Sequence, residues 1–389
     1  MGKEKMSNID VKRINRNRVY RYINKHSRLS RPDISHALGI SSPTVLHIVG
    51  ELLEKGLISE DGTLESTGGR KAKALSPIHD ANYAVGLDIA QDHIGMVLTD
   101  LSGAVLKRFR KPKHFEYSEA YLEDISRELT DFIHEARVPE EKLLGAGISI
   151  PGIINARDRV LTVSHALKLK SIPCDEISKY IPFDCVFTND ANAAAIAEIS
   201  CFENDSTALY LSLNNVVGGA VITPKIVSAY ADVETSWCSE NIYMGDNWKS
   251  GEIGHMTLIP SGKPCYCGQK GCLDAYCAAK NLAALTDGSL HLFFKRLDSD
   301  KKLQAVWSEY LRNLAASINS LRMLMDCNII VGGDVGGYME PHIGRLREYL
   351  REINTFYEDA SYLRSCKYKV EASAFGAALL HIERFINSV

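Results

Sequence analysis

Residues 251–274 read GEIGHMTLIPSGKPCYCGQKGCLD, and the interpretation of the whole chain starts from this stretch. One histidine and three cysteines fall within eighteen residues, with glycines between the cysteines. Three thiolates and one imidazole suit a tetrahedral zinc ion, and small residues let the chain turn around it. The alternative, ordinary buried cysteines, suits a lone cysteine better than this cluster. The sequence predicts a structural zinc site, with no open coordination position, made by His255, Cys265, Cys267 and Cys272.

The same stretch resembles a family signature. Gly-Glu-x-Gly-His followed by Cys-x-Cys-Gly-x-x-Gly-Cys-Leu and an acid is similar to the signature of the ROK family, named for repressors, open reading frames and sugar kinases. The resemblance implies that His255 also contacts a bound sugar, because a metal on one ring nitrogen fixes the direction of the other. It implies that Glu252 accepts a hydrogen bond from a sugar hydroxyl. It also implies a sugar contact at Asp274, where the family usually has the longer glutamate.

Length and charge suggest more than one domain. A chain of 389 residues suggests about two or three domains. Residues 1–80 hold 14 Lys/Arg against 9 Asp/Glu, a net +5, whereas residues 81–389 hold 31 against 39, a net −8. A basic N-terminal part suggests a polyanionic partner. Without an apolar run of about 18 residues or a signal-peptide segment, and with ten scattered or metal-predicted cysteines, we expect a cytoplasmic protein that does not enter a membrane.

The N-terminal part, residues 1–80, has the pattern of a helix-turn-helix. Residues 11–24 predict a basic amphipathic helix, and Ser30 with Pro32 begins a second helix that ends at Gly39. Ser42 is expected to cap a third helix that runs to about Lys55. A glycine turn between two helices with matching apolar spacing favours DNA binding over two unrelated short helices. The third helix would then present Ser42, Thr44 and His47 to the major groove of operator DNA.

A wing is expected after the third helix. Asp61-Gly62 is a strong turn signal, and residues 66–71 read STGGRK. Glycine next to arginine lets the chain approach a phosphate backbone or a narrow minor groove, so Gly69 and Arg70 are predicted DNA contacts. A flexible basic linker is the alternative. Residues 1–80 as a unit resemble the N-terminal winged helix-turn-helix domain of ROK repressors.

Residues 81–389 have the sequence pattern of an α/β domain, with buried strands and helices. Strands are expected at residues 83–89, 94–100 and 145–150, and they resemble the opening of an actin-like ATPase (ribonuclease H-like) fold of two lobes. A further strand leads into Asn189-Asp190 and an alanine-rich helix. In ROK sugar kinases this pair holds the sugar, and the aspartate is the general base for the attacking hydroxyl. The resemblance implies these roles here, although Asn-Asp alone is also a common turn dipeptide.

The expected phosphate loops lack the residues that they need. Phosphate is bound by closely approaching backbone N–H groups, which requires glycine. The family's Asp-x-Gly-Gly-Thr loop corresponds to residues 88–92, DIAQD, and its Gly-Thr-Gly-x-Gly-Gly-Gly loop to residues 214–220, NNVVGGA. Asp92 would place a carboxylate beside phosphate oxygens, and the β-branched Val216 cannot readily adopt a positive φ. We therefore expect that ATP does not bind productively, whereas the sugar-binding residues are retained.

Two other departures bear on the ligand. Residues 226–250 make the approach to Glu252 longer than the family pattern, so Asp246–Ser250 are expected to form a new pocket wall. His165 lies roughly where the family has another sugar contact, with core or surface placement as the alternatives. Near the C-terminus, residues 329–336 and 373–378 resemble the family's strand-Gly-Gly turn and its closing helix.

The combined hypothesis is a repressor-type transcriptional regulator of sugar-metabolism genes. A dimer, or a dimer of dimers, would bind double-stranded operator DNA through winged helix-turn-helix domains, with DNA affinity controlled by a sugar in the zinc-containing body. Two alternatives remain: an active kinase of a hexose or N-acetylhexosamine that carries a DNA-binding domain, with Asp190 as its base, and a sensor of a partner protein. Release of ADP would distinguish the kinase, and a sugar-induced shift in melting temperature would distinguish the sugar sensor from the partner-protein sensor.

Overall fold

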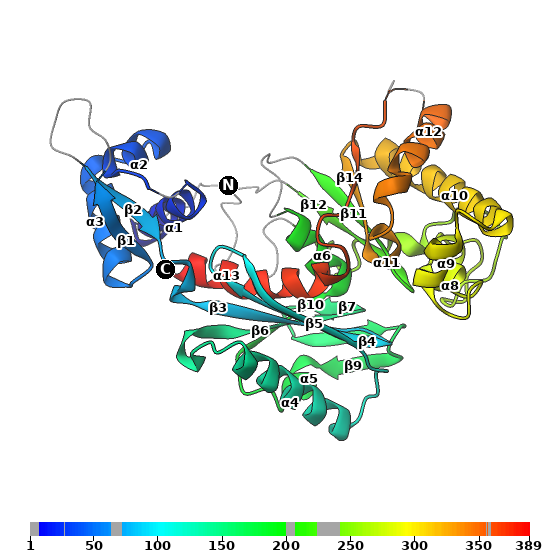
Figure 1. Ribbon diagram of the computed structural model, residues 1–389, viewed down its shortest axis with the longest axis horizontal. Helices are drawn as coiled ribbons and strands as arrows, with labels where there is room; N and C mark the ends of the chain where they lie inside the picture. The colour runs from blue at the N-terminus through cyan, green and yellow to red at the C-terminus, as the bar shows by residue number, and fades with distance from the viewer. Residues whose placement is uncertain are drawn as a thin grey trace.

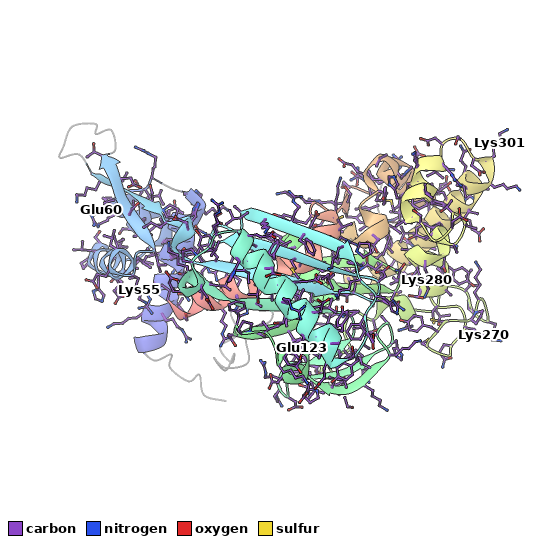
Figure 2. The ribbon with its side chains drawn as sticks, turned by 60° about the horizontal axis from the view of Figure 1, so that its bottom comes forward. Lys55, Glu60, Glu123, Lys270, Lys280 and Lys301 are labelled. Atoms are coloured by element: carbon purple, nitrogen blue, oxygen red, sulfur yellow. The ribbon has the colours of Figure 1, made fainter. Side chains whose placement is uncertain are left out.

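The computed structural model describes residues 8–26, 28–63, 72–199, 207–223, 242–354, 356 and 359–389. Figure 1 shows three parts: an N-terminal helical unit at one end, a lobe built on strands β3–β6, and a second lobe built on β11, β12 and β14. We call the first part the head and the other two lobe one and lobe two. Figure 2 shows that Lys55 and Glu60 of the head lie at the opposite end of the molecule from Lys270 and Lys280 of lobe two.

The head consists of three helices and a hairpin, α1 (Asn8–His26), α2 (Arg31–Leu38), α3 (Ser42–Glu54), β1 (Ile58–Thr63) and β2 (Lys73–Pro77). Ser30 begins α2 as expected: its hydroxyl accepts from Asp33 N at 3.2 Å, and the Asp33 carboxylate accepts from Ser30 N at 2.9 Å. Gly39 ends α2 with φ of 64°, a conformation that glycine adopts without strain. The predicted winged helix-turn-helix is therefore confirmed.

Two local predictions in the head were wrong. The N-cap position of α3 is held by Ser41, not Ser42, and the Ser41 side chain makes no capping hydrogen bond. Pro43 is tolerated in the first turn and therefore does not mark the first residue of the helix. Asp61-Gly62 is not the hairpin turn: both residues belong to β1, where the register shifts between Glu60 and Thr63 and Gly62 has φ of 73°. The sequence signal marks a bulge. The tip of the wing, with Gly69 and Arg70, lies outside the described residues.

Lobe one is a five-stranded sheet between two helical layers. Its strand order is β10-β6-β3-β4-β5, from β10 (Cys185–Asn189), β6 (Leu143–Ile150), β3 (Tyr83–Ile89), β4 (His93–Asp100) and β5 (Val105–Pro112). Helix α4 (Glu119–Glu135) covers one face, and α13 (Ala372–Ser388) covers the other. Helix α13 lies so close that a Cβ on Gly86 would fall 1.7 Å from Ala374 O, and one on Gly147 1.9 Å from Ala377 O. These two glycines are therefore required by packing.

A small antiparallel sheet extends lobe one beside the cleft, with β7 (Ile153–Asn155), β8 (Val160–Ser164), β9 (Leu169–Pro173) and the following helix α5 (Cys174–Ser178). Helix α6 (Asp190–Ile199) leaves the end of β10, and a Cβ on Gly376 of α13 would fall 1.7 Å from Ala193 O in α6. Helices α6 and α13 are thus packed together in direct backbone contact. Any shift of α6 must be accommodated by α13.

Lobe two is a second five-stranded sheet, in the order β13-β12-β11-β14-β15. Its strands are β13 (Ile242–Tyr243), β12 (Val217–Ile222), β11 (Ala208–Leu213), β14 (Asn328–Gly332) and β15 (Leu363–Ser365). Its helices are α7 (Asp274–Cys277), α8 (Ala279–Ala283), α9 (Leu290–Arg296), α10 (Lys301–Met325), α11 (Gly333–Gly336) and α12 (Ile343–Ile353). Lobe two has its own buried core, which includes Trp307 and Phe293. The predicted two-lobed α/β body is confirmed.

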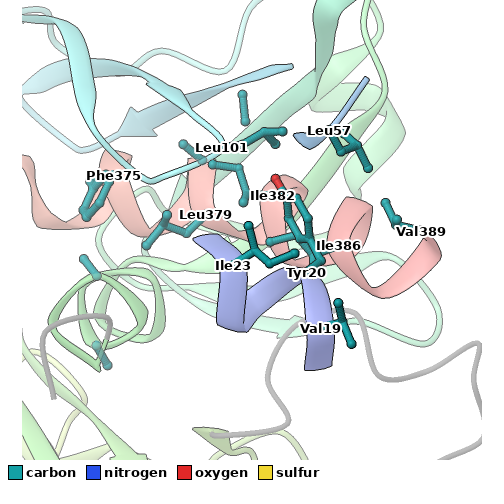
Figure 3. Close-up of a cluster of buried hydrophobic side chains, with 14 of the residues drawn as sticks. Val19, Tyr20, Ile23, Leu57, Leu101, Phe375, Leu379, Ile382, Ile386 and Val389 are labelled. Carbon is teal, nitrogen blue, oxygen red and sulfur yellow. The ribbon is translucent and has the colours of Figure 1, made fainter. Parts of the chain in front are cut away.

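The head and lobe one share one hydrophobic core. Val19, Tyr20 and Ile23 of α1 are buried against the C-terminal half of α13, where Ile382 and Ile386 point toward them (Figure 3). A bidentate ion pair at the rim joins Arg21 to Glu383, with N–O distances of 2.9 and 2.6 Å. Because burial of several large apolar side chains is worth several kcal/mol, the head is fixed to α13. The predicted domain boundary at residue 80 stays a prediction.

Candidate functional site

A cavity of about 350 Å³ opens between the two lobes, and its volume lies within the range of small-molecule sites. Its walls come from the end of lobe one, the start of α6, strand β12 and the segment after β13. Polar and aromatic side chains on these walls belong to His165, Asn189, Asp190, Asn192, Trp248, Lys249, Ser250, Glu252, His255 and Tyr266. Of the predicted sugar contacts, Asn189, Asp190, Glu252 and His255 are therefore brought together. The expected new wall is present at residues 248–250.

The side chain of Asn189 is largely engaged by backbone groups of other residues. Its side-chain oxygen accepts from the N–H groups of Ala191 and Asn192 at 2.9 and 3.1 Å, so it caps α6. Its Nδ2 donates to Gly152 O at 3.0 Å. An amide nitrogen carries two hydrogens, so one N–H of Asn189 remains for a ligand. Asn189 thus positions the first turn of α6 and offers a single donor to the cavity.

Asp190, the first residue of α6, lines the cavity directly. Burial raises the pKa of its carboxyl to about 7, with the negative charge of Asp88 as the second cause. A carboxyl group whose pKa is near neutrality can accept a proton from a hydroxyl or hydrogen-bond it. Its backbone oxygen accepts from the hydroxyl of Ser373, at the start of α13, at 3.2 Å. Asp190 therefore connects the cavity with the helix that carries the head.

The four predicted metal ligands form one cluster. His255 ends the short 3-10 helix η4 (Ile253–His255), and the ligand atoms of His255, Cys265, Cys267 and Cys272 all lie within 4.8 Å of one another. The Cys267 and Cys272 sulfurs are 3.8 Å apart. Two thiolates on one tetrahedral zinc ion are also about 3.8 Å apart, because each Zn–S bond is about 2.3 Å. The donor set and its spacing therefore fit a metal ion.

The two ring nitrogens of His255 have separate surroundings. Nδ1 lies 3.8 Å from the Cys265 sulfur and faces the cluster. Nε2 faces the cavity, 3.1 Å from the Tyr266 hydroxyl and 4.0 Å from a carboxylate oxygen of Glu252. Burial in the cavity wall raises the pKa of Glu252. This arrangement is the one required for a histidine that binds a metal on one side and a ligand on the other.

Asp274 does not line the cavity. Its carboxylate is buried, accepts from Val217 N at 2.7 Å, and lies 3.7 Å from the Lys280 ammonium. The side chain therefore fixes the start of β12 instead of reaching a ligand, and the prediction of a sugar contact at Asp274 is not supported by its position. His165, for which the sequence left core or surface placement open, does lie on the cavity wall, with its ring 5.6 Å from that of Tyr266.

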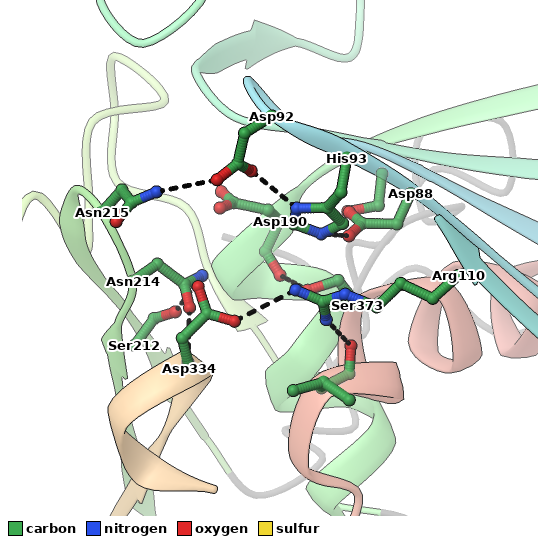
Figure 4. A network of polar contacts seen from close by, with 12 residues as sticks. Asp88, Asp92, His93, Arg110, Asp190, Ser212, Asn214, Asn215, Asp334 and Ser373 are labelled. Carbon is green, nitrogen blue, oxygen red and sulfur yellow. Dashed lines mark hydrogen bonds and ion pairs between the residues drawn. The ribbon is translucent and has the colours of Figure 1, made fainter. Parts of the chain in front are cut away.

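Beyond Asp190, residues of the two expected phosphate loops line a second cavity, and a network of polar side chains lies there (Figure 4). This second cavity has a volume of about 70 Å³, well below the roughly 300 Å³ of small-molecule sites. His93 contacts Asp92 at 2.8 Å and Asp88 at 3.5 Å. Burial lowers the pKa of His93, but the two carboxylates outweigh it and raise that pKa to about 9. His93 is therefore held as a cation directly after the expected first phosphate loop, residues 88–92.

The same polar groups tie the two lobes together. Asp92 of lobe one accepts from Asn215 of lobe two at 3.2 Å, and Arg110 of β5 donates to Asp334 of α11 at 3.2 Å. Asn214 in turn accepts from Asp334 N at 2.8 Å. The carboxylate of Asp92, the last residue of the expected first phosphate loop, is thus engaged by His93 and Asn215. In this conformation the lobes meet through these side-chain contacts.

The outer surface of α3 carries the predicted DNA contacts. Ser42 and His47 are exposed, and Thr44 is half-buried, with its hydroxyl 2.8 Å from that of Ser41. His47 Nε2 lies 3.1 Å from Glu51, which also accepts from Arg16 at 2.9 Å. Leu46, which sequence reasoning missed, is 59% exposed on the same helix. An exposed apolar side chain at this position suits contact with a thymine methyl group.

Comparison with known sequences decides the family. The sequence model of the ROK family matches residues 84–384, and that of a winged helix-turn-helix DNA-binding domain matches residues 12–59. The chain belongs to the ROK family. The xylose repressor of Bacillus spizizenii is 30% identical over 283 residues, which are 70% of this chain and 67% of that repressor. The N-acetylglucosamine repressor of Escherichia coli O157:H7 is 24% identical over 281 residues, 71% of this chain and 66% of the relative.

Solved ROK structures share the fold. The crystal structure of a ROK family transcriptional regulator, a homolog of the E. coli MLC protein, matches with a TM-score of 0.74 and 20% identity and covers 97% of both chains. A ROK family glucokinase from Streptomyces griseus, in complex with glucose and AMPPNP, matches with a TM-score of 0.61 and 21% identity, over 77% of this chain and 99% of that one. Within the described part of the ROK chain, no helix is long and apolar enough to cross a membrane.

One aromatic cavity residue of the ROK domain, Tyr266, was missed in the sequence, and Trp248 was expected only as part of the wall formed by Asp246–Ser250. Trp248 and Tyr266 both line the cavity. Tyr266 could have been found, because a side chain between two cysteines that bind the same ion must lie beside that ion. Trp248 has no such signal. Its φ of 59° and its place on the wall depend on the path of the segment after β13.

The Asp190→Asn variant is expected to be more stable than the natural chain at neutral pH. Proton binding by Asp190 favours the folded state fully below about pH 4 and is lost as the pH rises through the folded pKa of about 7. Since one pH unit corresponds to about 1.4 kcal/mol, the gain is at most about 4 kcal/mol above pH 7. Urea unfolding at pH 4 and pH 8 measures it. Asp131→Asn, at an exposed position of α4, should show no such gain.

Proposed function

We propose that this ROK-family chain is a repressor of sugar-metabolism genes whose affinity for operator DNA is controlled by a sugar in the interlobe cavity. The observation that carries the proposal is the continuous packing from the cavity to the head. Asp190 begins α6, Ser373 of α13 contacts Asp190, and α13 shares a core with α1 of the head. The printed names of two relatives, a xylose repressor and an N-acetylglucosamine repressor, agree with this function.

On the sugar side, each cavity group has a distinct role. The carboxylates of Asp190 and Glu252 accept from sugar hydroxyls, and the free N–H of Asn189 donates to a sugar oxygen. We propose zinc as the ion of the His255–Cys265–Cys267–Cys272 cluster, since three thiolates and an imidazole suit it. A bound zinc ion fixes the ring of His255, so that its Nε2 presents a directed hydrogen bond to the sugar.

We propose that the ROK domain is non-catalytic, because the expected phosphate loops lack their glycines and the cavity beside them is small and lined by charged side chains. His93, Asp92 and the Arg110–Asp334 pair line the second cavity, beside the expected phosphate loops. The kinase alternative retains one supporting observation, a carboxyl at Asp190 with a pKa of about 7. Coupled measurement of ADP release separates the two, and we expect none above background with any sugar. The partner-protein alternative required a closed cavity, whereas the described residues leave about 350 Å³ open.

Control of DNA binding would operate through helix position. Two heads of a dimer bind half-sites only at the correct spacing, so a change in the direction of α13 alters operator affinity. A sugar that draws the lobes together against Asp190 changes the packing of α6 on α13. Because the head is fixed to α13 by Tyr20 and Ile23, it moves with that helix. The dimer itself is part of the proposal.

Replacing Ser42 and His47 together by alanine is expected to reduce affinity for the operator by about 5- to 150-fold, since a good base contact is worth about 1–3 kcal/mol. The loss should be much smaller on a scrambled duplex, because neither change removes a lysine or arginine that contacts phosphate. Fluorescence anisotropy with both duplexes at one stated salt concentration measures it. His291→Ala, exposed on α9 of lobe two, is the control. Equal losses on both duplexes would remove α3 from the role of recognition helix.

A further inference from the structure

The ring nitrogen that faces the cavity is already engaged by the protein. The Tyr266 hydroxyl lies 3.1 Å from His255 Nε2, within hydrogen-bond distance. The other nitrogen, Nδ1, is directed at the cysteine cluster. Nε2 is therefore the one hydrogen-bonding atom that His255 can offer to a ligand in the cavity. It is paired with a side chain of the same loop.

The direction of this hydrogen bond follows from the metal site. A neutral imidazole that binds a cation through Nδ1 carries its proton on Nε2, so Nε2 donates and the phenol oxygen of Tyr266 accepts. A sugar hydroxyl oxygen at the same place would accept the same proton. One N–H makes one strong, linear hydrogen bond, so the phenol oxygen and the sugar oxygen compete for it.

The Tyr266 ring is held in place by its surroundings. Two histidine rings lie near it, with centroid distances of 5.3 Å to His255 and 5.6 Å to His165. The Lys280 ammonium lies 5.1 Å from the ring centroid, a cation–π distance. The backbone of Tyr266 is fixed on both sides by Cys265 and Cys267, two members of the metal cluster. The phenol is therefore presented to Nε2 by the fold itself.

We propose that the Tyr266 hydroxyl is an internal competitor that takes the place of one sugar hydroxyl on His255 until the sugar displaces it. The inference rests on the proposed function, because it takes the cavity to be a sugar site. Its consequence is that the Tyr266–His255 contact sets the sugar concentration at which the protein responds. The sugar must break the contact between Tyr266 and His255 before it forms its own, so a higher sugar concentration is needed for the response. The ring remains as a wall against which the sugar packs.

The variant that tests this proposal is Tyr266→Phe, which removes the oxygen and keeps the ring. We expect the affinity for the sugar effector to rise by about twofold to tenfold, the value of one hydrogen bond that no longer has to be broken. Calorimetry with a panel of monosaccharides and their amino and phosphorylated forms measures it. The gain should disappear with the single monodeoxy analogue that lacks the hydroxyl bound by His255. Tyr117→Phe, 44% exposed and outside the cavity wall, is the control.

The outcomes separate this inference from the proposed function. Zinc content and melting temperature of Tyr266→Phe should equal those of the natural chain, so that a change in affinity is not a folding effect. If the natural chain binds a sugar and Tyr266→Phe binds it equally or more weakly, the phenol is a neutral wall or a direct sugar contact, and the inference is overturned while the function stands. If neither protein binds any sugar of the panel, the proposed function fails, and the inference fails with it.

Discussion

Replacing Cys267 by serine is expected to abolish tight metal binding and most of the sugar affinity. A serine hydroxyl is a poor substitute for a thiolate, and the three remaining donors leave one tetrahedral position open. Since even the loss of a group that only orients a metal ligand costs about 10- to 100-fold in metal affinity, the loss of a ligand should cost on the order of 100-fold or more. His255 then loses its fixed direction, and the loop that carries Glu252 loosens.

Two measurements on Cys267→Ser check this result. Metal analysis should find much less zinc than the roughly one ion per chain expected of a structural site. Calorimetry should find sugar binding weakened by at least about tenfold, the loss of a directed hydrogen bond to a charged or metal-held group. Cys327→Ser is the matched control, because Cys327 is buried but lies outside the cluster. It should lower stability and leave zinc content unchanged. Full zinc content and an unchanged sugar affinity in Cys267→Ser would show that the cluster has no part in the site.

The second large effect is expected at the contact between head and body. Ile386 of α13 is 4% exposed and packs with Val19, Tyr20 and Ile23 in one buried cluster (Figure 3). Ile386→Ala should lower the free energy of unfolding by about 2–5 kcal/mol, the usual cost of such a truncation. More specifically, it should reduce the ratio of DNA affinities measured without and with sugar, because the head no longer follows α13 closely.

The ratio of DNA affinities without and with sugar distinguishes a loss of coupling between cavity and head from a general loss of stability. Ile318→Ala truncates an equally buried isoleucine in the separate core of lobe two, so it should lower stability by a similar amount and leave the ratio intact. Glu383→Ala removes only the partly exposed ion pair with Arg21, and such pairs are worth about 0–1 kcal/mol, so a small effect is expected. An Ile386→Ala variant that retains the full sugar-dependent ratio would mean that the signal does not travel through this contact.

The features that could be predicted from the sequence are those whose cause is local. Spacing alone placed Cys265, Cys267 and Cys272 in one cluster, because a short glycine-containing loop brings its own thiolates together. Gly39 and the Ser30 cap identified the ends of α2 in the same way. Asp61-Gly62 misled because a glycine with positive φ serves a bulge as well as a turn, and the choice depends on the pairing of β1 with β2.

Contacts between distant segments could not be predicted. The family resemblance suggested a sugar contact at Asp274, but Val217 N, 57 residues earlier, lies within hydrogen-bond distance and takes the carboxylate. The packing of α1 on α13 joins opposite ends of the chain, and apolar residues on both helices are equally compatible with many partners. The missing glycines suggested that ATP does not bind productively, but they did not predict the ion pair of Arg110 with Asp334, because this pair depends on how the lobes meet.

The most direct test is binding of the purified full chain to its own upstream DNA, at one stated salt concentration, with and without a panel of monosaccharides and their amino and phosphorylated forms. We expect specific binding and one sugar that changes the affinity, by a factor that corresponds to about 1–3 kcal/mol of coupling free energy. Specific DNA binding that is indifferent to every sugar, or no specific binding together with sugar-dependent release of ADP, would contradict a sugar-controlled repressor.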